Sequence, residues 1–308
     1  MTRGILRSVR SPCLAEVFAV SMARIDRVPI SVLIPTRNEA SNLPRCLEPL
    51  KDWADEIVIV DSGSTDGTQD IATSFGAAVL QFQYAGGWPK KRQWALDTYP
   101  FRNEWILLLD ADEILLEPIK QEIASAIKST EYAGYWLRFQ VYFLGKQLTH
   151  GGFDLWKLFL FRRGKGRYEK RLETQDANMS DIEVHEHVVV DGKVGRLRNP
   201  IRHENFNSLF RYIQKHNEYS EWEARVYLEG HKGEVAPSFF GTQAQRRRWL
   251  KSKLFRVPGF PLMTFLYHYI IRLGFLDGKP GLIYCGMKGV QRFHAKSKLV
   301  ELELGQSK

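Results

Sequence analysis

The stretch Trp105–Glu113, Trp-Ile-Leu-Leu-Leu-Asp-Ala-Asp-Glu, decides how the rest of the sequence is interpreted. Its apolar run has no polar alternation, which predicts a strand buried on both faces, as in a parallel sheet. The run ends in three acids, Asp110, Asp112 and Glu113. Ligands of open α/β sheets bind outside the carboxyl ends of the strands, so these acids are expected beside a ligand. A hard cation such as Mg²⁺ or Mn²⁺ between Asp110 and Asp112 would relieve their repulsion. The alternative is a solvated acidic turn after a strand.

The composition is that of a folded protein, with 308 residues, 44% hydrophobic and 26% charged. This length allows one large core with a smaller appendage. The net charge of +9 is uneven, because Arg246–Arg256 holds six cations and no acid. Trp249, Leu250, Leu254 and Phe255 are interleaved with these cations, a pattern that predicts a helix lying flat on an anionic membrane surface. No nucleic-acid recognition motif accompanies the run, so we expect no nucleic-acid partner.

Residues 1–28 are predicted to be an N-terminal extension, either unstructured or the result of a start codon assigned too early, with Met22 as the true start. The three scattered cysteines form neither a disulfide framework nor a metal cluster, which fits a reducing cytosol. No stretch reaches the ~18–20 apolar residues of a spanning helix. The nearest is Phe260–Ile271.

Strands and helices alternate in the first part of the chain, which predicts a parallel, doubly wound sheet. The predicted elements, in order, are strand Ile30–Pro35, helix Ala40–Leu50, strand Glu56–Val60, helix Gln69–Phe75, strand Ala77–Phe82, helix Pro89–Leu96 and strand Trp105–Leu109. After Lys128 the pattern changes to aromatic strands. The later predicted elements are strands Gly134–Leu144, Leu158–Arg163 and Glu183–Val190, and a helical segment His203–Tyr227.

The glycine-rich phosphate-binding loops of dehydrogenases and P-loop proteins are missing from this sequence. The second predicted strand ends instead in an acid, Asp61, followed by Ser-Gly-Ser-Thr-Asp-Gly-Thr. An acid at this place is suited to accept hydrogen bonds from a ribose hydroxyl or a base N–H. The alternative is that the polar cluster caps the following helix, and Asp66 is expected to be such a cap.

Three motifs occur in order at suitable separations: Val-Leu-Ile-Pro-Thr-Arg-Asn-Glu at 32–39, Ile-Val-Ile-Val-Asp-Ser-Gly-Ser-Thr-Asp-Gly-Thr at 57–68, and Leu-Leu-Asp-Ala-Asp-Glu at 108–113. Together they resemble the donor half of family 2 glycosyltransferases with the GT-A fold. More narrowly, the chain resembles bacterial lipopolysaccharide-core and colanic-acid-type exopolysaccharide transferases. The resemblance implies a Rossmann-like, mostly parallel sheet flanked by helices.

By position, the resemblance implies a nucleotide-sugar site lined by Pro35, Thr36, Glu39, Asp61, Lys91, Arg92, Asp110 and Ala111. Asp110-Ala111-Asp112 then corresponds to the Asp-x-Asp motif. Asp112 is the implied metal ligand, with Asp110 and His185 as alternatives, and the cofactor is Mg²⁺ or Mn²⁺. Lys91 and Arg92 would contact the diphosphate. The alternative for these two residues is a solvated basic helix face.

Inverting sugar transfer needs a carboxylate that takes the proton of the acceptor hydroxyl. Many family members supply it from a Glu-Asp pair, which this sequence does not contain. The narrower group has Val-His-Glu at the corresponding place, which indicates Glu186 as the base. On a strand, Glu186 would face opposite His185 and His187. His185 as a metal ligand is therefore the competing assignment, and a zinc half-site made by the two histidines lacks further ligands.

The sequence thus predicts an inverting glycosyltransferase that moves a sugar from a nucleotide-diphosphate donor to a lipid-linked saccharide in cell-envelope polysaccharide or lipopolysaccharide synthesis. We expect a GT-A domain at 29–205, with a donor half at 29–115 and an acceptor half at 116–205. Residues 206–308 form a helical, membrane-associating region, and the protein would lie in the cytoplasm, peripherally on the inner face of the membrane. The alternatives are a non-catalytic carbohydrate- or membrane-binding scaffold that keeps the fold, and a nucleotidyltransferase, whose glycine-rich basic loop is missing.

Overall fold

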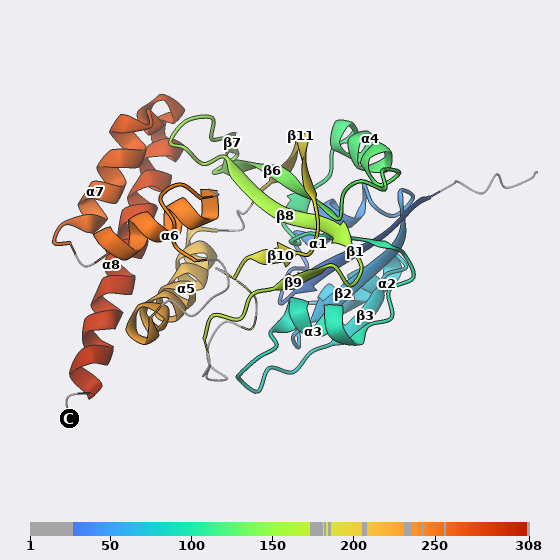
Figure 1. Cartoon of the computed structure of the whole chain (residues 1–308), viewed down its shortest axis with the longest axis horizontal. Helices are drawn as coiled ribbons and strands as arrows, with labels where there is room; N and C mark the ends of the chain where they lie inside the picture. Colours follow the sequence, from blue (N-terminus) through green and yellow to red (C-terminus); the bar gives the residue numbers. More distant parts are fainter. Residues whose placement is uncertain are drawn as a thin grey trace, which may run out of the picture.

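The structure is a computed structural model that describes residues 27–172, 181, 183, 186–204, 208–230, 236–241, 243–255 and 257–306. A twisted sheet with flanking helices forms one end of the molecule, and the C-terminal helices α5–α8 gather at the other end (Figure 1). The strand order in the large sheet is β3-β2-β1-β4-β8-β6-β11-β5, with β7 beside β6. The predicted fold class, α/β with a mostly parallel sheet flanked by helices and a helical C-terminal part, is confirmed.

The first half of the sheet is fully parallel and matches the predicted alternation. Its elements are β1 (Val28–Thr36), α1 (Leu43–Leu47), β2 (Ala54–Asp61), α2 (Thr68–Ser74), β3 (Ala78–Gln81), α3 (Lys91–Thr98) and β4 (Trp105–Leu108). All four residues of β4 are buried, as its unbroken apolar run predicts. The carboxyl ends of β1, β2 and β4 therefore lie at one edge of the sheet.

The second half of the sheet is mixed, because β8 runs antiparallel to both β4 and β6. Its elements are β5 (Glu113–Ile114), α4 (Glu117–Ala126), β6 (Gly134–Phe143), β7 (Lys146–Gln147), β8 (Leu155–Arg162) and β11 (Val194–His203). A separate small sheet pairs β9 (Gly166–Tyr168) with β10 (Val188–Val190). The predicted strand Glu183–Val190 is wrong in extent, since β10 begins at Val188 and Glu186 and His187 lie outside it.

Strand β11 was missed by the sequence analysis, which assigned His203 to the start of a helix. His203 is the last residue of β11, and α5 (Leu209–Glu229) begins six residues later with Ser208 as its N-cap. Only Leu197 and Ile201 of this arginine-rich strand are buried, so its apolar alternation is weak. The end of β11 pairs with β5, directly after the acids that follow β4.

The C-terminal helices pack against the sheet through an aromatic cluster. They are α6 (Gln243–Leu254), α7 (Phe260–Leu266), the π-helical turn η1 (Tyr267–Ile271), the 3₁₀ turn η2 (Gly274–Asp277) and α8 (Gly278–Gln306). Phe143 of β6 meets Tyr212 of α5 and Tyr284 of α8 edge to face, at ring-centroid distances of 5.5 and 5.0 Å. This cluster joins residues on both sides of the predicted domain boundary at 205/206.

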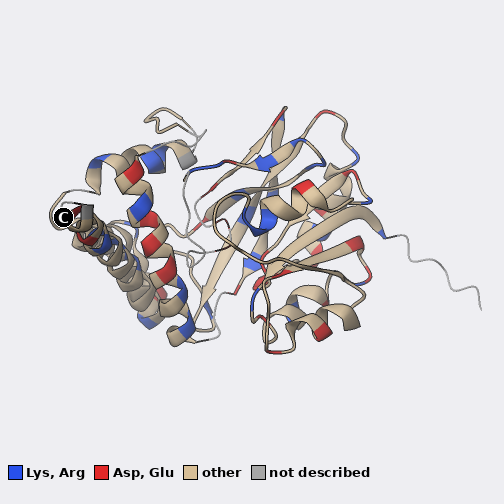
Figure 2. Ribbon diagram, turned by 90° about the horizontal axis from the view of Figure 1, so that it is seen from below, with Lys and Arg blue, Asp and Glu red and all other residues tan. Residues whose placement is uncertain are grey.

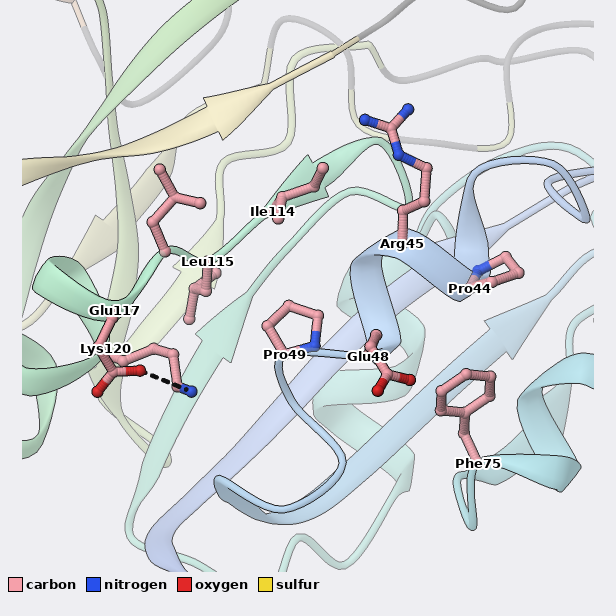
Figure 3. Close-up of a pocket in the computed structure, with 10 residues that line it drawn as sticks. Pro44, Arg45, Glu48, Pro49, Phe75, Ile114, Leu115, Glu117 and Lys120 are labelled. Carbon is pink, nitrogen blue, oxygen red and sulfur yellow. Dashed lines mark ion pairs between the residues drawn. The ribbon is translucent and has the colours of Figure 1, made fainter.

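No helix in the described part of the chain is sufficiently long and apolar to cross a bilayer. A shallow apolar pocket lies between α1 and α4, on the side of α1 shown in Figure 3. Its lining includes Pro44, Pro49, Phe75 and Leu115, with the ion pair Glu117–Lys120 at its rim. The acids after β4 do not line this pocket.

His216 of α5 allows a test of how α5 packs. Its ring stacks on Tyr212 at 3.8 Å, and its Nδ1 donates to the carbonyl of Tyr212 at 2.8 Å. Burial, together with the positive charge of Lys288, lowers the pKa of His216 to about 3. The unfolded chain takes up this proton near pH 6.5, so the stability due to neutral His216 is present above pH 6.5 and is lost on acidification.

We therefore expect the wild type to lose about 1.4 kcal/mol of unfolding free energy per pH unit below 6.5, relative to His216→Phe. The variant keeps the aromatic contact with Tyr212 and lacks the titrating group. Urea denaturation of both proteins at pH 7, 6 and 5 measures the difference. A difference that stays constant across this range would contradict the buried, neutral histidine.

Candidate functional site

Asp61 ends β2 and is enclosed by hydrogen-bond donors of the protein. Its carboxylate accepts from the Thr36 hydroxyl (2.7 Å), the Ser64 backbone N–H (2.8 Å) and Gln69 Nε2 (2.8 Å). Burial raises the pKa of Asp61, but these hydrogen bonds outweigh burial and hold the pKa below its ordinary value. Asp61 is fully buried. In this structure it fixes the end of β2 against the end of β1, and a nucleoside would have to replace one of its present partners.

The loops after β1 and β2 are joined by hydrogen bonds from backbone to side chain. The bonds run from Asn38 to Ser64 (2.8 Å), from Glu39 to Thr68 (2.9 Å) and from Ala40 to Asp66 (3.0 Å). Asp66 also accepts from the N–H of Thr68, the first residue of α2, at 3.2 Å, but the N-cap position is Gly67, so the predicted cap at Asp66 is off by one residue. These bonds place Pro35, Thr36 and Glu39 beside Asp61 at one edge of the sheet.

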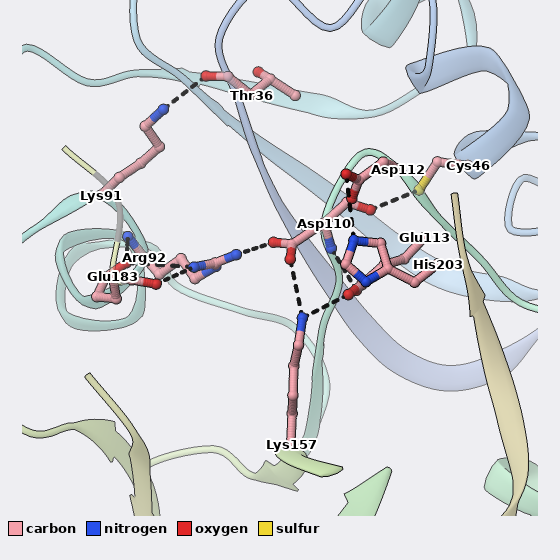
Figure 4. Close-up of polar contacts among 10 residues, drawn as sticks. All are labelled: Thr36, Cys46, Lys91, Arg92, Asp110, Asp112, Glu113, Lys157, Glu183 and His203. Carbon is pink, nitrogen blue, oxygen red and sulfur yellow. Dashed lines mark hydrogen bonds and ion pairs between the residues drawn. The ribbon is translucent and has the colours of Figure 1, made fainter. Parts of the chain in front are cut away.

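Asp110 is held between two cations (Figure 4). The Arg92 guanidinium donates to Oδ1, and Lys157 Nζ of β8 lies 3.2 Å from Oδ2. Burial raises the pKa of Asp110, but Arg92 and Lys157 lower it well below its usual range. The same contacts raise the pKa of Arg92 against the effect of burial. Asp110 is therefore a charged, compensated carboxylate whose oxygens both face cations.

Glu113 supports the turn that contains the Asp-x-Asp motif. Its Oε2 accepts the backbone N–H of Asp110 at 2.8 Å, and its Oε1 accepts from Lys157 at 2.7 Å. Burial raises the pKa of Glu113 to about 7, although Lys157 opposes the rise. The side chain is fully buried. Glu113 thus acts inside the protein, where it orients Asp110.

Asp112 faces a histidine that the sequence analysis did not consider as a site residue. His203 Nε2 lies 3.5 Å from Asp112 Oδ2, because His203 pairs with Glu113 across β5 and β11. Burial raises the pKa of Asp112, but His203 and Lys215 lower it; in return Asp112 raises the pKa of His203 against burial. Asp112 Oδ1 is buried and accepts no hydrogen bond from the described residues. This oxygen can therefore accept a hydrogen bond or coordinate a cation.

The cations at the start of α3 are matched one to one with acids from 181–186. Lys90 Nζ lies 2.9 Å from Glu186 Oε1, and Lys91 Nζ lies 3.1 Å from Asp181 Oδ2. The third pair joins Arg92 Nη1 to the Glu183 carbonyl at 3.1 Å, and Glu183 Oε1 caps α3 by accepting the Gln93 N–H at 2.9 Å. These three cations are at most 3% exposed. The alternative of a solvated basic face at Lys91 and Arg92 is therefore wrong.

Lys91 also joins the two ends of the site, since its Nζ donates to the Thr36 carbonyl at 2.8 Å. Burial lowers the pKa of Lys91, while Asp181 and Asp61 oppose the shift. Thr36 in turn bonds Asp61, and Arg92, the next residue after Lys91, bonds Asp110. Asp61 and Asp110 therefore belong to one connected polar network that runs through the first turn of α3.

Glu186, the predicted base, has a fully buried side chain in its pair with Lys90. Lys90 Nζ also lies 5.2 Å from the centre of the Trp222 ring of α5. Because Glu186 is outside β10, the strand alternation used to place it relative to His187 does not apply. His185, the alternative metal ligand, lies outside the described residues.

Helix α5 brings a further cation toward the acids. The neighbouring Tyr219 and the carboxylates of Asp112 and Glu39 raise the pKa of Lys215 against the effect of burial. Burial raises the pKa of Glu39, and Lys215 opposes that rise. The C-terminal part of the chain thus contributes charge to the site built on the sheet.

The sequence analysis missed Lys90, Lys157, His203 and Lys215 as members of this network. Lys157 and His203 come from β8 and β11, whose antiparallel and parallel partners cannot be assigned from the sequence alone. A signal was present only for Lys90, which is the first of two lysines before Arg92 in the segment assigned to the diphosphate.

A family profile described as "Glycosyl transferase family 2" matches residues 31–187. The chain is 31% identical over 272 residues to the lipopolysaccharide core biosynthesis glycosyltransferase LpsC of Rhizobium meliloti (strain 1021). This alignment covers 86% of this chain and 86% of LpsC. It is 27% identical over 282 residues to an uncharacterized glycosyltransferase of Rickettsia bellii, covering 89% of this chain and 87% of that one.

The solved structure of S. aureus TarS 1–349 in complex with UDP-GlcNAc is similar at a TM-score of 0.47 and 14% identity, covering 90% of this chain and 92% of that chain. The profile and the relatives show that this chain belongs to family 2 of the glycosyltransferases and is an enzyme of that class, with the GT-A architecture. The predicted resemblance to lipopolysaccharide-core transferases is likewise confirmed.

Lys157 gives a direct test of the charge balance at Asp110 and Glu113. Replacing it by Met leaves the buried Glu113 and the partly buried Asp110 with fewer compensating charges, so we expect a loss of about 3 kcal/mol of unfolding free energy. Adding Glu113→Gln to Lys157→Met should restore part of that loss. Urea denaturation at pH 7.5 measures both. A loss below about 1 kcal/mol in the single variant, or no recovery in the double variant, would contradict the assignment.

Proposed function

We propose that the enzyme is an inverting, metal-dependent glycosyltransferase that moves a sugar from a nucleotide-diphosphate donor to a lipid-linked saccharide of the cell envelope. The observation that carries this proposal is Asp112 Oδ1, a buried carboxylate oxygen without a hydrogen-bond donor among the described residues, at the carboxyl edge of the sheet. Arg92, a proposed diphosphate contact, pairs with Asp110 two residues before Asp112, and His203 lies beside Asp112 itself. Such an arrangement binds an anion and a cation together.

The donor is proposed to bind along Pro35, Thr36, Glu39, Asp61, Lys91, Arg92, Asp110 and Ala111. Support comes from the continuous network that links Asp61, Thr36 and Lys91 and from the burial of Lys91 and Arg92. A diphosphate presents several anionic oxygens to these cations, so its binding exchanges their pairs with Asp181 and Glu183 for pairs with phosphate. The site is selective for anions because each cation is buried and costly to leave without a counter-charge.

A divalent metal fits the residues present. Asp112 offers its free buried oxygen, and His203 lies next to the same carboxylate. Asp110 is less suited to be a ligand, because both of its oxygens face cations. One or two protein ligands suffice for Mg²⁺, which usually completes its shell with substrate phosphates and water. A bound Mg²⁺ or Mn²⁺ supplies the positive charge that stabilises the departing diphosphate.

Glu186 is proposed as the base that takes the proton of the acceptor hydroxyl as its oxygen attacks the anomeric carbon. Its ion pair with Lys90 has to open for this step. A donor diphosphate supplies that opening if Lys90 turns from the carboxylate to a phosphate, which exposes the base only when the donor is present. Lys90 would then keep Glu186 from acting as a base while no donor is bound.

A lipid-linked saccharide is the proposed acceptor. This step rests on the likeness to LpsC, whose name places it in lipopolysaccharide core biosynthesis, and on the position of the acceptor half beside the C-terminal helices. The proposed location is the inner face of the cytoplasmic membrane. The product should have the anomeric configuration opposite to that of the donor, which NMR of the product reveals.

Asp112→Asn is expected to abolish the metal-dependent part of donor binding. The wild type should be stabilised by its nucleotide sugar with Mn²⁺, by about 2.7 kcal/mol at 100 times the dissociation constant, and much less with chelator. His203→Gln should weaken Mn²⁺ binding, measured by the EPR signal of free Mn²⁺. Asp97→Asn, an exposed acid of α3, is the matched control. Equal stabilisation of Asp112→Asn with and without Mn²⁺ at wild-type magnitude would exclude Asp112 as the ligand.

Glu186→Gln should lower kcat at least ~100-fold, in line with the loss of a positioned base, while the thermal shift with donor stays. Glu117→Gln, at an exposed residue of α4, serves as the control. Lys90→Met should instead raise donor hydrolysis relative to transfer, since the base is then no longer held. Transfer by Glu186→Gln within a few-fold of wild type would remove Glu186 from the role of base.

A further inference from the structure

The C-terminal hairpin, formed by α7, η1, η2 and the first part of α8 (residues 260–290), has glycines where its two arms meet and many large apolar side chains exposed. Glycines occupy its inner side. A Cβ on Gly281 would lie 2.2 Å from the Gly274 carbonyl oxygen, and one on Gly289 would lie 2.9 Å from that of Pro261. The two arms are therefore in backbone contact. Close packing through small residues is how helices associate where the surroundings are apolar.

Phe260 and Tyr284 of the hairpin are buried against the rest of the protein. Ten other large apolar residues, in positions 262–282, form its outer face and are between 39% and 70% exposed. They are Leu262, Met263, Leu266, Tyr267, Ile270, Ile271, Leu273, Phe275, Leu276 and Leu282. Successive members four residues apart along α7 and η1 form stripes on one side of the helix. A water-exposed helix carries polar residues on this side. Contiguous exposed apolar surface of this kind marks an interaction site.

The polar groups of the hairpin are used to dock it on the sheet half, which fixes which side faces outward. Asp277 is 1% exposed and accepts from the His150 N–H at 2.9 Å and from the Thr149 hydroxyl at 3.1 Å. Lys146 Nζ donates to the Asp277 carbonyl, and the Gly151 N–H donates to the Arg272 carbonyl at 2.7 Å. The outer face is thus held away from the loop after β7.

Charge selects the partner of this face. Residues 236–300 contain twelve Lys and Arg and a single acid, Asp277, which is buried. Figure 2 shows blue segments, which mark Lys and Arg, on the C-terminal helices. Arg248 and Arg292 are buried in ion pairs with Glu169 and Glu223, so the surface charge comes from the exposed cations, among them Arg246 and Lys253. Arg272 and Lys279 are exposed within the hairpin itself. Apolar side chains flanked by cations match the acyl boundary and headgroups of an anionic bilayer.

The predicted anchor, helix α6, is a poorer candidate for lying flat on this surface. Arg248 is 7% exposed and forms an ion pair with the buried Glu169, and Phe255, just after α6, is 1% exposed in a cluster with Ala224 and Phe260. The interpretation of Trp249, Leu250, Leu254 and Phe255 as a free membrane face is therefore wrong for Phe255. The cations of α6 that remain exposed, such as Arg246 and Lys253, add to the charge around the hairpin.

We propose that the outer face of the C-terminal hairpin docks on an anionic lipid bilayer and lies in the headgroup layer without crossing it. A nucleic acid would use the cations but not the apolar stripes. Leu273 adds a further observation: it has a left-handed backbone, φ +59°, which is unfavourable for a residue with a Cβ, and it is 46% exposed. The docking proposal depends on the proposed function in one respect: docking would bring a lipid-linked acceptor beside the site.

The test is co-flotation of the full-length protein with two kinds of vesicle. One kind is phosphatidylcholine alone, and the other contains in addition about 30% of the anionic lipid phosphatidylglycerol. The wild type should float with anionic vesicles, less so at high salt, and hardly with neutral ones. Leu266→Glu/Ile270→Glu should bind vesicles at least about tenfold more weakly, because two apolar side chains that would enter the bilayer are replaced by charged ones. Leu116→Glu, the same change at an exposed leucine before α4, should bind as the wild type does.

Leu273→Gly separates docking from folding, since it removes an unfavourable conformation and an apolar side chain together. Its melting temperature should equal or exceed that of the wild type while vesicle binding falls. Undiminished vesicle binding of Leu266→Glu/Ile270→Glu would overturn the proposal. So would a change of this variant from dimer to monomer with no change in vesicle binding. The proposal would also fail if the wild type bound DNA as well as it binds vesicles and the variant kept that DNA binding. Donor-induced stabilisation in solution should be unchanged in these variants and lost in Asp112→Asn, so the two proposals fail separately.

Discussion

The compensation of buried carboxylates at the ends of parallel strands is the constraint on which the rest of this structure depends. Asp110, Asp112 and Glu113 follow β4 within five residues; Asp112 and Glu113 are buried, and the Asp110 side chain is 25% exposed. Like charges so close together in a low dielectric are unfavourable unless cations accompany them. The fold supplies these cations from α3 and β8 and a histidine from β11, elements that are distant in the sequence. The mixed second half of the sheet is needed because it brings these residues back to the edge.

The same principle extends to the start of α3, where Lys90, Lys91 and Arg92 each meet an acid from 181–186. A protein that binds a diphosphate must keep several cations together before the ligand arrives. Internal acids keep such a cluster stable, at the cost that the ligand has to compete with them. This competition links donor binding to Glu186 in the proposed mechanism, since the base is one of the internal acids.

The C-terminal helices serve the sheet in two ways. Helix α5 reaches toward the acids with Lys215 and packs Trp222 beside Lys90, so the site is built from both parts of the chain. The C-terminal hairpin is joined to the loop after β7 by Asp277, and many of its large apolar residues remain exposed. The site and the proposed membrane contact are therefore attached to one packed unit, which suits the proposed lipid-linked acceptor.

The sequence by itself determined the parallel half of the sheet, because β1, β2 and β4 are built on largely apolar runs followed by polar residues. It also determined the family, through the motifs at 32–39, 57–68 and 108–113, and it indicated the acids of the edge, because strand ends of parallel sheets converge. Only the tertiary structure decided which cations and which histidine meet those acids. Lys157 and His203 lie 47 and 91 residues from Asp110 and Asp112, and no local pattern encodes such pairings. The strand β11 was hidden because its exposed arginines obscure the alternation. The burial of Arg248 and Phe255 could not be predicted either. A helix that mixes cations with apolar residues has the same local sequence whether it faces lipid or a buried glutamate.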